Sequence, residues 1–318
     1  MKKVLIIIAV IILVVALVVF LSAFIAAGFD FSKIGKARYD THVYTADTNF
    51  SKIDVYSGVD DITFLPSSDG KCSVECLEPK KVTHTVTVED GTLKIGVKDE
   101  RIWIDFIALF TKSPSITVYL PSNIYESIAV KCGTGNITIP GAFSFSSVSV
   151  RGGTGNTLCM CSATDSISVS STTGNITLTG VHTNSLTLDA TTGNITASTI
   201  ECSGEVTVNI TTGNLKLIDF NCSKLTCKGT TGNLNLTNVI ASGDFSIEST
   251  TGSIRFDKCD ADNIKAKSTT GTITGSLRSA KHFGASSSTG RVSVPSTTTG
   301  GICELSTTTG NINISVVE

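Results

Sequence analysis

The carboxylates that could do chemistry are few and dispersed. Glycan-cleaving solenoids need two carboxylates held a fixed distance apart on one face, and the densest acidic group in this chain of 318 residues is Asp257, Asp260 and Asp262. Three acids in a row could hold a cation, but a solvated turn explains them better. This group therefore predicts no catalytic pair.

Histidines offer no clearer site, because they are scattered and lack a companion motif for a nucleophile or a metal. They are His42, His84, His182 and His282. The formal net charge of −2 and the lack of a basic block argue against a nucleic-acid partner. The sequence predicts a non-catalytic protein with no cofactor.

Ten cysteines are the remaining reactive residues. The close pairs Cys72 with Cys76 and Cys159 with Cys161 permit metal binding, but neither has the distant second pair that makes a zinc site convincing. We therefore predict structural thiols and no metal site.

The elements that position these residues are copies of one repeat. A Thr-Gly step recurs ten times at intervals of 19 or 20 residues. Its corner glycines are Gly135, Gly155, Gly174, Gly193, Gly213, Gly232, Gly252, Gly271, Gly290 and Gly310. A fixed period of this size indicates units that stack on their neighbours.

Each repeat reads as short strands with one buried face. In the repeat of Gly174, apolar residues alternate with polar ones at Ile167 and Val169 before the glycine and at Ile176 and Leu178 after it. A third apolar position follows about seven residues after each glycine. The pattern predicts an all-β, single-stranded β-helix (a β-solenoid) with coils of 19–20 residues and three sides.

The Thr-Thr-Gly-Asn corner has a structural explanation. Glycine tolerates left-handed backbone angles, and asparagine bonds its own turn. Stacked in register, the asparagines would form a side-chain ladder. They are Asn136, Asn156, Asn175, Asn194, Asn214, Asn233 and Asn311.

Most cysteines follow the same repeat. Five of them fall on inward phases, where thiols act as small hydrophobic groups; they are Cys132, Cys159, Cys227, Cys259 and Cys303. Cys202 and Cys222 share one phase of adjacent coils, which permits a close pair.

The N-terminus predicts a membrane anchor over residues 1–30. An uncharged, mostly aliphatic run from Val4 to Phe29 is long enough to span a bilayer. A signal peptide cleaved near Ala23 to Ala27 is the alternative, although the run exceeds a usual signal core. Basic residues flank both ends, so the positive-inside rule does not decide the orientation.

The rest of the chain divides into three parts. Residues 31–45 read as a polar linker, residues 46–125 as a β-rich region that caps the first coil, and residues 126–318 as the solenoid repeats. Within the capping region, Arg101–Phe110 holds the only tryptophan and is expected to pack on the cap, with a membrane-surface or partner-binding role as the alternatives.

These patterns resemble a bacterial family of domains of unknown function called putative adhesins. The resemblance rests on ITVYLP at Ile116–Pro121, on IAVKCGTGNITI at Ile128–Ile139 and on the later TTGNI and TTGNL corners. It covers the chain from about residue 50 onward. It implies a surface or envelope protein, with relatives linked to adhesion and to envelope-stress signalling.

Three functions remain open at this point. The first is adhesin-like binding of cell-wall or host glycan, or of an envelope protein, by a polar face that repeats at the coil spacing. The second is a self-assembling, membrane-tethered scaffold like the bactofilins, because the chain stops directly after its last repeat and leaves that coil uncapped. The third is envelope-stress sensing. We expect a single-pass cell-membrane protein with its solenoid outside the cytoplasm, whereas a solenoid in the cytoplasm would favour the scaffold.

Overall fold

The computed structural model describes residues 2–26, 39–46, 49–100 and 113–317. The first element is helix α1 (Lys2–Ala26), whose side chains are described at residues 11–22 and at Ile25. The apolar ones are exposed, with Leu13 69% and Ile12 63% accessible. Within the described residues we find no helix both long and apolar enough to cross a membrane.

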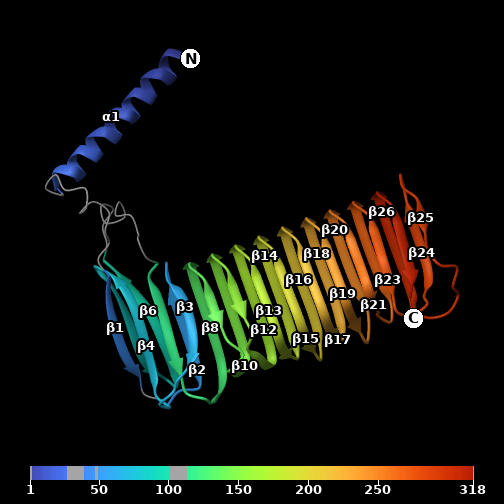
Figure 1. The fold of residues 1–318 in the computed structure, drawn as a ribbon, viewed down its shortest axis with the longest axis horizontal. Coiled ribbons are helices and arrows are strands. Elements are labelled where there is room, and N and C mark those ends of the chain that lie inside the picture. The colour runs from blue at the N-terminus through green and yellow to red at the C-terminus, as the bar shows by residue number, and fades with distance from the viewer. Residues whose placement is uncertain (1, 27–38, 47–48, 101–112, 318) are drawn as a thin grey trace.

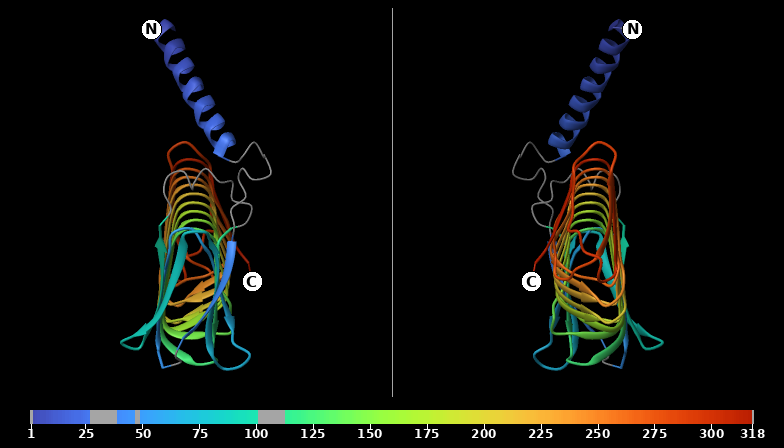
Figure 2. Two further views of the ribbon diagram at one scale, coloured as in Figure 1. Left: turned by 90° about the vertical axis from the view of Figure 1, so that its left-hand side faces the viewer. Right: turned by 90° about the vertical axis from the view of Figure 1, so that its right-hand side faces the viewer.

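The rest of the described chain winds into a solenoid of two sheets, shown side-on in Figure 1 and end-on in Figure 2. Sheet A has the strand order β1 (Tyr39–Ala46), β4 (Cys72–Pro79), β7 (Ser115–Leu120), β3 (Asp61–Pro66), β9 (Ile137–Ile139), β11 (Thr157–Cys159), β13 (Ile176–Thr183), β15 (Ile195–Cys202), β17 (Leu215–Cys222), β19 (Leu234–Ala241), β21 (Ile254–Cys259), β23 (Ile273–Leu277), β27 (Ile312–Val316) and β25 (Val292–Ser293). Sheet B has the order β24 (His282–Ser287), β26 (Ile302–Thr309), β22 (Ile264–Thr270), β20 (Phe245–Thr251), β18 (Lys224–Thr231), β16 (Glu205–Thr212), β14 (Ser185–Thr192), β12 (Ser162–Thr173), β10 (Ser144–Thr154), β8 (Ile124–Thr134), β2 (Lys52–Ser57), β6 (Thr92–Asp99) and β5 (Val82–Glu89).

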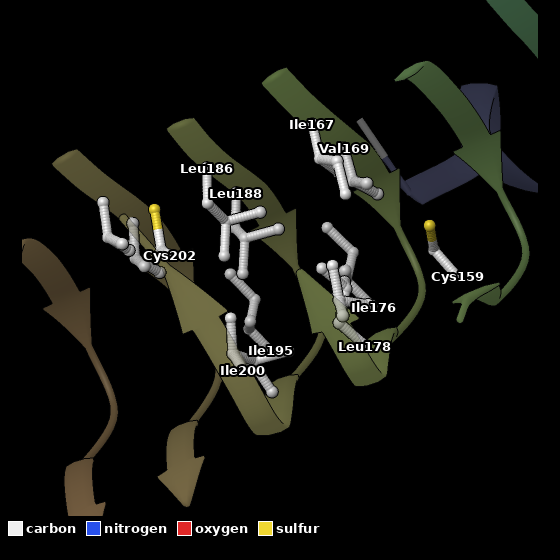
Figure 3. Close-up of a cluster of buried hydrophobic side chains, with 14 of the residues drawn as sticks. Cys159, Ile167, Val169, Ile176, Leu178, Leu186, Leu188, Ile195, Ile200 and Cys202 are labelled. Carbon is white, nitrogen blue, oxygen red and sulfur yellow. The ribbon is translucent and has the colours of Figure 1, made fainter. Parts of the chain in front are cut away.

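Successive coils pair in parallel, and equivalent residues stack. Ile167 of β12 lies beside Leu186 of β14, and Ile176 of β13 lies beside Ile195 of β15. These side chains point between the two sheets and are at most 1% exposed (Figure 3). The period-two pattern buries one side of each strand, so the predicted β-solenoid is confirmed.

The coil has two sheets, so the prediction of three sides is wrong. The apolar position about seven residues after the corner glycine lies in the same sheet A strand as the apolar residues that follow the glycine directly. A residue with positive φ bends that strand just before this third apolar position. These bend residues are Gly180, Thr199, Asp219, Asn238 and Lys258, with φ between 51° and 66°. A left-handed residue turns the chain without ending its hydrogen-bonded ladder, which gives two inward stretches in one strand.

The N-terminal end begins as a coil and closes with antiparallel strands. β2 and β3 pair in parallel with β8 and β9, so coil stacking extends into the predicted capping region. Beyond them, β1 pairs antiparallel with β4, and β5 pairs antiparallel with β6. β1 starts at Tyr39, inside the stretch predicted as a linker. Arg101–Phe110 lies outside the described residues.

The C-terminal end reverses the order of the last two coils. β26 and β27, which come last in the sequence, lie between the coil of β22 and β23 and the coil of β24 and β25. The prediction that the last repeat in the sequence forms an uncapped coil is therefore wrong. The earlier coil covers the later one, and β24 and β25 form the end of the stack.

Candidate functional site

The corner glycines form one backbone column along the stack. Nine of the ten have φ between 129° and 156°, Gly290 being the exception. A Cβ built on any of the ten would lie 1.8–2.2 Å from the carbonyl oxygen of the corner residue stacked against it. The coils approach too closely for any side chain here, so these glycines have a structural role.

The corner asparagines form a second column. The side-chain oxygen of Asn175 accepts the backbone N–H of Asn194 at 2.9 Å, and that of Asn194 accepts the N–H of Asn214 at 2.9 Å. The same bond joins Asn136 to Asn156, Asn156 to Asn175, Asn214 to Asn233, Asn233 to Ser253, and Asn311 to Arg291. Asp61 begins the column by accepting from the N–H of Asn136 at 2.7 Å. Each side-chain oxygen thus accepts the backbone N–H of the stacked coil, and these hydrogen bonds join successive coils.

The outward face of sheet B carries a row of functional side chains. Parallel pairing places Tyr56, Lys131, Arg151, Ser170 and Asp189 side by side on five successive strands. We name these five residues the Tyr56–Asp189 row. They line a hollow of about 400 Å³ beside the corner. An aromatic ring, two cations, a hydroxyl and a carboxylate thus follow one another at the strand spacing of about 4.8 Å.

Glycines line part of this hollow, because the coil backbones approach too closely there for side chains. A Cβ on Gly133 would lie 2.5 Å from the Gly58 carbonyl oxygen, and one on Gly153 would lie 2.2 Å from the Gly133 carbonyl oxygen. Tyr56 is 52% exposed. The Lys131 ammonium lies 5.6 Å from the centroid of the Tyr56 ring, which is a cation–π contact.

A second groove of about 610 Å³ runs along the opposite turn, where sheet A strands pass to sheet B. His182, Glu201 and Asn221 lie on its rim in register. The His182 imidazole pairs with the Glu201 carboxylate at 2.9 Å, and both side chains are 66% exposed. An exposed pair of this kind contributes little to stability.

The acidic group singled out in the sequence does not converge. Asp260 is paired with the buried ammonium of Lys281 at 2.9 Å and accepts from the hydroxyl of Ser279 at 2.8 Å. The negative charge of Asp260 is therefore already paired with the positive charge of Lys281. Asp262 is exposed.

All ten cysteines are buried with free thiols. Burial raises the pKa of Cys72 to about 11 and that of Cys222 to about 12, so these thiols are protonated at neutral pH. The Sγ atoms of Cys159 and Cys161 are 3.5 Å apart. A buried, protonated thiol is a poor nucleophile and packs as an apolar group.

A buried polar cluster lies at the N-terminal end, and it was not predicted. Glu78, at the end of β4, is 2% exposed and accepts four hydrogen bonds. Its Oε1 accepts the backbone N–H of His84 at 2.7 Å, lies 2.8 Å from His84 Nδ1, and accepts the hydroxyl of Tyr44 at 3.0 Å. Its Oε2 lies 2.7 Å from His42 Nδ1. Two of the histidines described above as scattered therefore meet at one carboxylate, which corrects that interpretation.

The other side of the His84 ring faces a second carboxylate. His84 Nε2 lies 3.3 Å from Asp60 Oδ2, which also accepts the Ser57 hydroxyl at 2.6 Å. Burial alone would lower the pKa of His84, but hydrogen bonds to Asp60 and Cys76 outweigh it and raise the pKa to about 10. Burial and the Glu78 carboxylate raise the pKa of Tyr44 to about 12.

Cys76 completes this cluster. One donor atom from each of Cys76, Glu78 and His84 lies within 4.8 Å of the other two, and all three residues are buried. The sequence did hold a signal for them. The inward alternation of β4 runs Cys72, Val74, Cys76, Glu78, and that of β5 starts Val82, His84, so polar residues stood at core positions.

Comparison with known proteins gives one family and several distant structures. The Toastrack DUF4097 family model matches residues 50–315. No curated protein matches the sequence. A structure titled putative adhesin from Parabacteroides distasonis ATCC 8503 is 14% identical, covers 88% of this chain and 98% of its own, and has a TM-score of 0.49.

Two further structures are similar at the same level. A protein titled putative lipid binding protein from Parabacteroides distasonis ATCC 8503 is 15% identical over 76% of this chain and 98% of its own, with a TM-score of 0.47. A putative adhesin from Bacteroides fragilis NCTC 9343 is 15% identical over 88% and 99%, with a TM-score of 0.39. None of these similarities bears on function. The family match, however, spans residues 50–315, which hold most of the repeats and the closing strands β4, β5 and β6, and the chain therefore belongs to the Toastrack DUF4097 family.

Proposed function

We propose that this chain is a non-catalytic, membrane-anchored protein of the cell envelope that binds an acidic surface glycan along sheet B in an adhesin-like manner. The observation that carries the proposal is the Tyr56–Asp189 row, because it places an exposed ring next to two cations in an open hollow. Strands repeat along the axis of the solenoid, and sugar units repeat along the chain of a polysaccharide. A rod with regularly spaced side chains therefore suits an extended polymer.

The chemistry of the row favours sugars that carry carboxylate or phosphate groups. The face of the Tyr56 ring is apolar and its hydroxyl is polar, which suits contact with a sugar ring. Arg151 presents a planar fork of N–H donors that matches carboxylate and phosphate oxygens, and Lys131 adds a second positive charge. Ser170 and Asp189 continue the row with groups that hydrogen-bond sugar hydroxyls.

A sedimentation assay tests this binding. We expect the full chain, purified in mild detergent, to co-sediment with peptidoglycan or teichoic-acid-bearing cell walls. Arg151→Ala and Tyr56→Ala should each weaken retention about tenfold, the effect of losing ~1.4 kcal/mol. Lys216→Ala is the matched control, since this exposed cation lies on sheet A. Equal retention of all four proteins, or no retention of the wild type, would count against the proposal.

The anchoring part of the proposal rests on α1. Its described apolar side chains, from Ile11 to Leu21, include nine that are 46–69% exposed and one, Val19, at 38%. Such a surface is costly in water and favourable in lipid. The anchor leaves both orientations open, and the proposed glycan binding requires the one with the solenoid outside the cytoplasm.

Labelling intact cells with a membrane-impermeant maleimide tests this placement. Because the ten native thiols are buried, the probe needs an introduced thiol, and Lys216→Cys supplies one at an exposed position. Labelling before lysis, with the wild type unlabelled, is expected. Labelling only after lysis would place the solenoid in the cytoplasm and exclude the adhesin-like role.

A second function, end-to-end self-association, is favoured by the C-terminal end. Within the described chain β24 pairs only with β26, so one edge of β24 is open. Val292 and Ile302 are 42% and 54% exposed beside it. Open strand edges are templates for pairing with another chain. Light scattering at high concentration should then show oligomers that Ala285→Pro in β24 removes; a monomer at every concentration would exclude the scaffold.

A further inference from the structure

The buried cluster at the N-terminal end combines three kinds of metal ligand at one point. A thiol, a carboxylate and an imidazole come from Cys76, Glu78 and His84, with one donor atom of each within 4.8 Å of the others. Tetrahedral zinc ligands lie about 3.3–3.8 Å apart, because zinc–ligand bonds are about 2.0–2.3 Å long. No pair of donor atoms has to draw together by more than about 1.5 Å. If Glu78 Oε1 and His84 Nδ1, which lie 2.8 Å apart, are the donors, these two atoms have to separate by about 0.5 Å.

This donor set is selective. Sulfur and imidazole nitrogen are preferred by zinc-class ions, whereas calcium and magnesium take oxygen ligands. Three protein ligands of the types Cys, His and Glu also leave a fourth position, which in zinc sites is filled by water or another side chain.

Asp60 supplies an independent observation. It is 1% exposed, its Oδ2 faces His84 Nε2, and its Oδ1 is buried without a hydrogen-bond partner among the described residues. An unpaired buried carboxylate oxygen is costly. The His84 ring faces Oδ2, so a cation bound beside it would give Oδ1 the partner that the ring does not provide.

The surroundings would also hold the ligands in place. A metal-bound histidine usually donates its second ring N–H to a carboxylate, which fixes the ring. His84 has a carboxylate at each ring nitrogen, Glu78 at 2.8 Å and Asp60 at 3.3 Å. Tyr44 donates to the same Glu78 oxygen, Oε1, at 3.0 Å, and His42 Nδ1 lies 2.7 Å from the other oxygen, Oε2. All three ligands lie on strands, β4 of sheet A and β5 of sheet B, and strands position ligands more firmly than loops do.

We propose that Cys76, Glu78 and His84 bind one zinc-class divalent cation in the core of the N-terminal end, with Asp60 positioned to assist. The ion ties β4 to β5 and, through Asp60, to the corner between β2 and β3. Its role is structural, because the three ligands are buried in the core, whereas the Tyr56–Asp189 row lies on the outer face. It does not depend on the proposed glycan binding.

Cobalt substitution tests the site directly. The full chain is expressed in cobalt-supplemented minimal medium, purified in mild detergent, and examined by absorption spectroscopy and by mass spectrometry for metal content. We expect one Co²⁺ per chain, a thiolate-to-cobalt absorption band, and replacement of Co²⁺ by Zn²⁺ with loss of the band. Protein from zinc-supplemented medium should contain one Zn²⁺.

Paired variants identify the ligands. Cys76→Ser should abolish the thiolate band, and Glu78→Gln should lower metal content at least tenfold. Cys72→Ser is the control, because Cys72 is buried on the same face of β4 but is not one of the three ligands. This variant should retain the thiolate band and the metal content. Wild-type protein without stoichiometric metal from either medium would overturn the proposal whether or not the variants fold. A band that persists in Cys76→Ser but disappears in Cys159→Ser would also overturn it.

Discussion

Gly310 stacks on Gly271, although Gly290 lies between them in the sequence. The N–H of Gly271 donates to the carbonyl of Thr309 at 2.9 Å, and a Cβ on Gly310 would lie 2.1 Å from the Gly271 oxygen. On its other side, the Gly310 oxygen would lie 1.9 Å from a Cβ on Gly290. The final coil is thus held between two others.

Replacing Gly310 by alanine should therefore destabilise the end of the stack. The Cβ would meet backbone on Gly271, and φ at this position is 144°, which L residues avoid. We expect a loss of roughly 1–3 kcal/mol, measured by urea unfolding. Gly284→Ala in β24 is the control, since its Cβ would meet nothing within 4 Å. Equal unfolding midpoints for the two variants would contradict the observed stacking.

The asparagine column should contribute at each step. Asn194→Ala removes the acceptor for the N–H of Asn214 and an amide that bonds Asn175 at 3.2 Å. Because the column is exposed, water replaces part of what is lost, and we expect a cost of about 1 kcal/mol. Asn194→Asp keeps the acceptor and should cost less. If urea unfolding ranks the aspartate variant below the alanine variant, the hydrogen bond to Asn214 is not the stabilising contact.

Glu78 should be far more sensitive than its neighbour on the same strand. Glu78→Ala leaves His84 Nδ1 and the His84 backbone N–H without their acceptor, and removing one partner of a buried pair costs about 3–5 kcal/mol. Glu75→Ala changes an exposed side chain on the opposite face of β4 and should stay within about 0.5 kcal/mol. Urea unfolding in the presence of a chelator separates this effect from any bound metal.

Alkaline pH should destabilise the fold through its thiols. Burial raises the pKa of Cys72, Cys132 and Cys259 to about 11 and that of Cys222 and Cys303 to about 12, from 9.0 in an open chain. The folded state then holds protons that the unfolded state has released. The stability these thiols contribute is complete below pH 9 and declines as pH rises through 11 to 12.

Each such thiol should steepen the decline by about 1.4 kcal/mol per pH unit. Unfolding free energies measured from pH 8 to 11 check this slope. Cys303→Ala should reduce the slope by about one such increment, whatever it does to stability at neutral pH. A slope unchanged by this variant would mean that Cys303 titrates normally in the fold.

The stacking of the coils could be predicted from the sequence, but their order could not. Alternation at residues such as Ile167 and Val169 identifies the buried face, and the corner spacing gives the register. The coils of Gly290 and Gly310, however, have the same period and the same kind of corner, so either fits against Gly271. Which coil lies outermost depends on how much core each can cover, and this is a tertiary property.

The buried cluster shows a different limit. Its members come from β1, β4, β5 and the corner between β2 and β3, all outside the regular repeat. Alternation places Glu78 and His84 on the inward face, but the antiparallel pairing that brings His42 and Tyr44 to Glu78 is not encoded by any period. Without a repeat to propagate register, the contacts between these segments could not be predicted.

The burial of the cysteines makes their susceptibility to oxidation depend on how far the coils have assembled. Each inward thiol, such as Cys227, is covered only when a neighbouring coil has been added to its strand. A chain that meets an oxidant before it has wound can cross-link sulfurs that belong to different coils, whereas a finished rod offers that oxidant nothing. Each thiol is therefore protected from oxidation at the stage of folding when the next coil covers it.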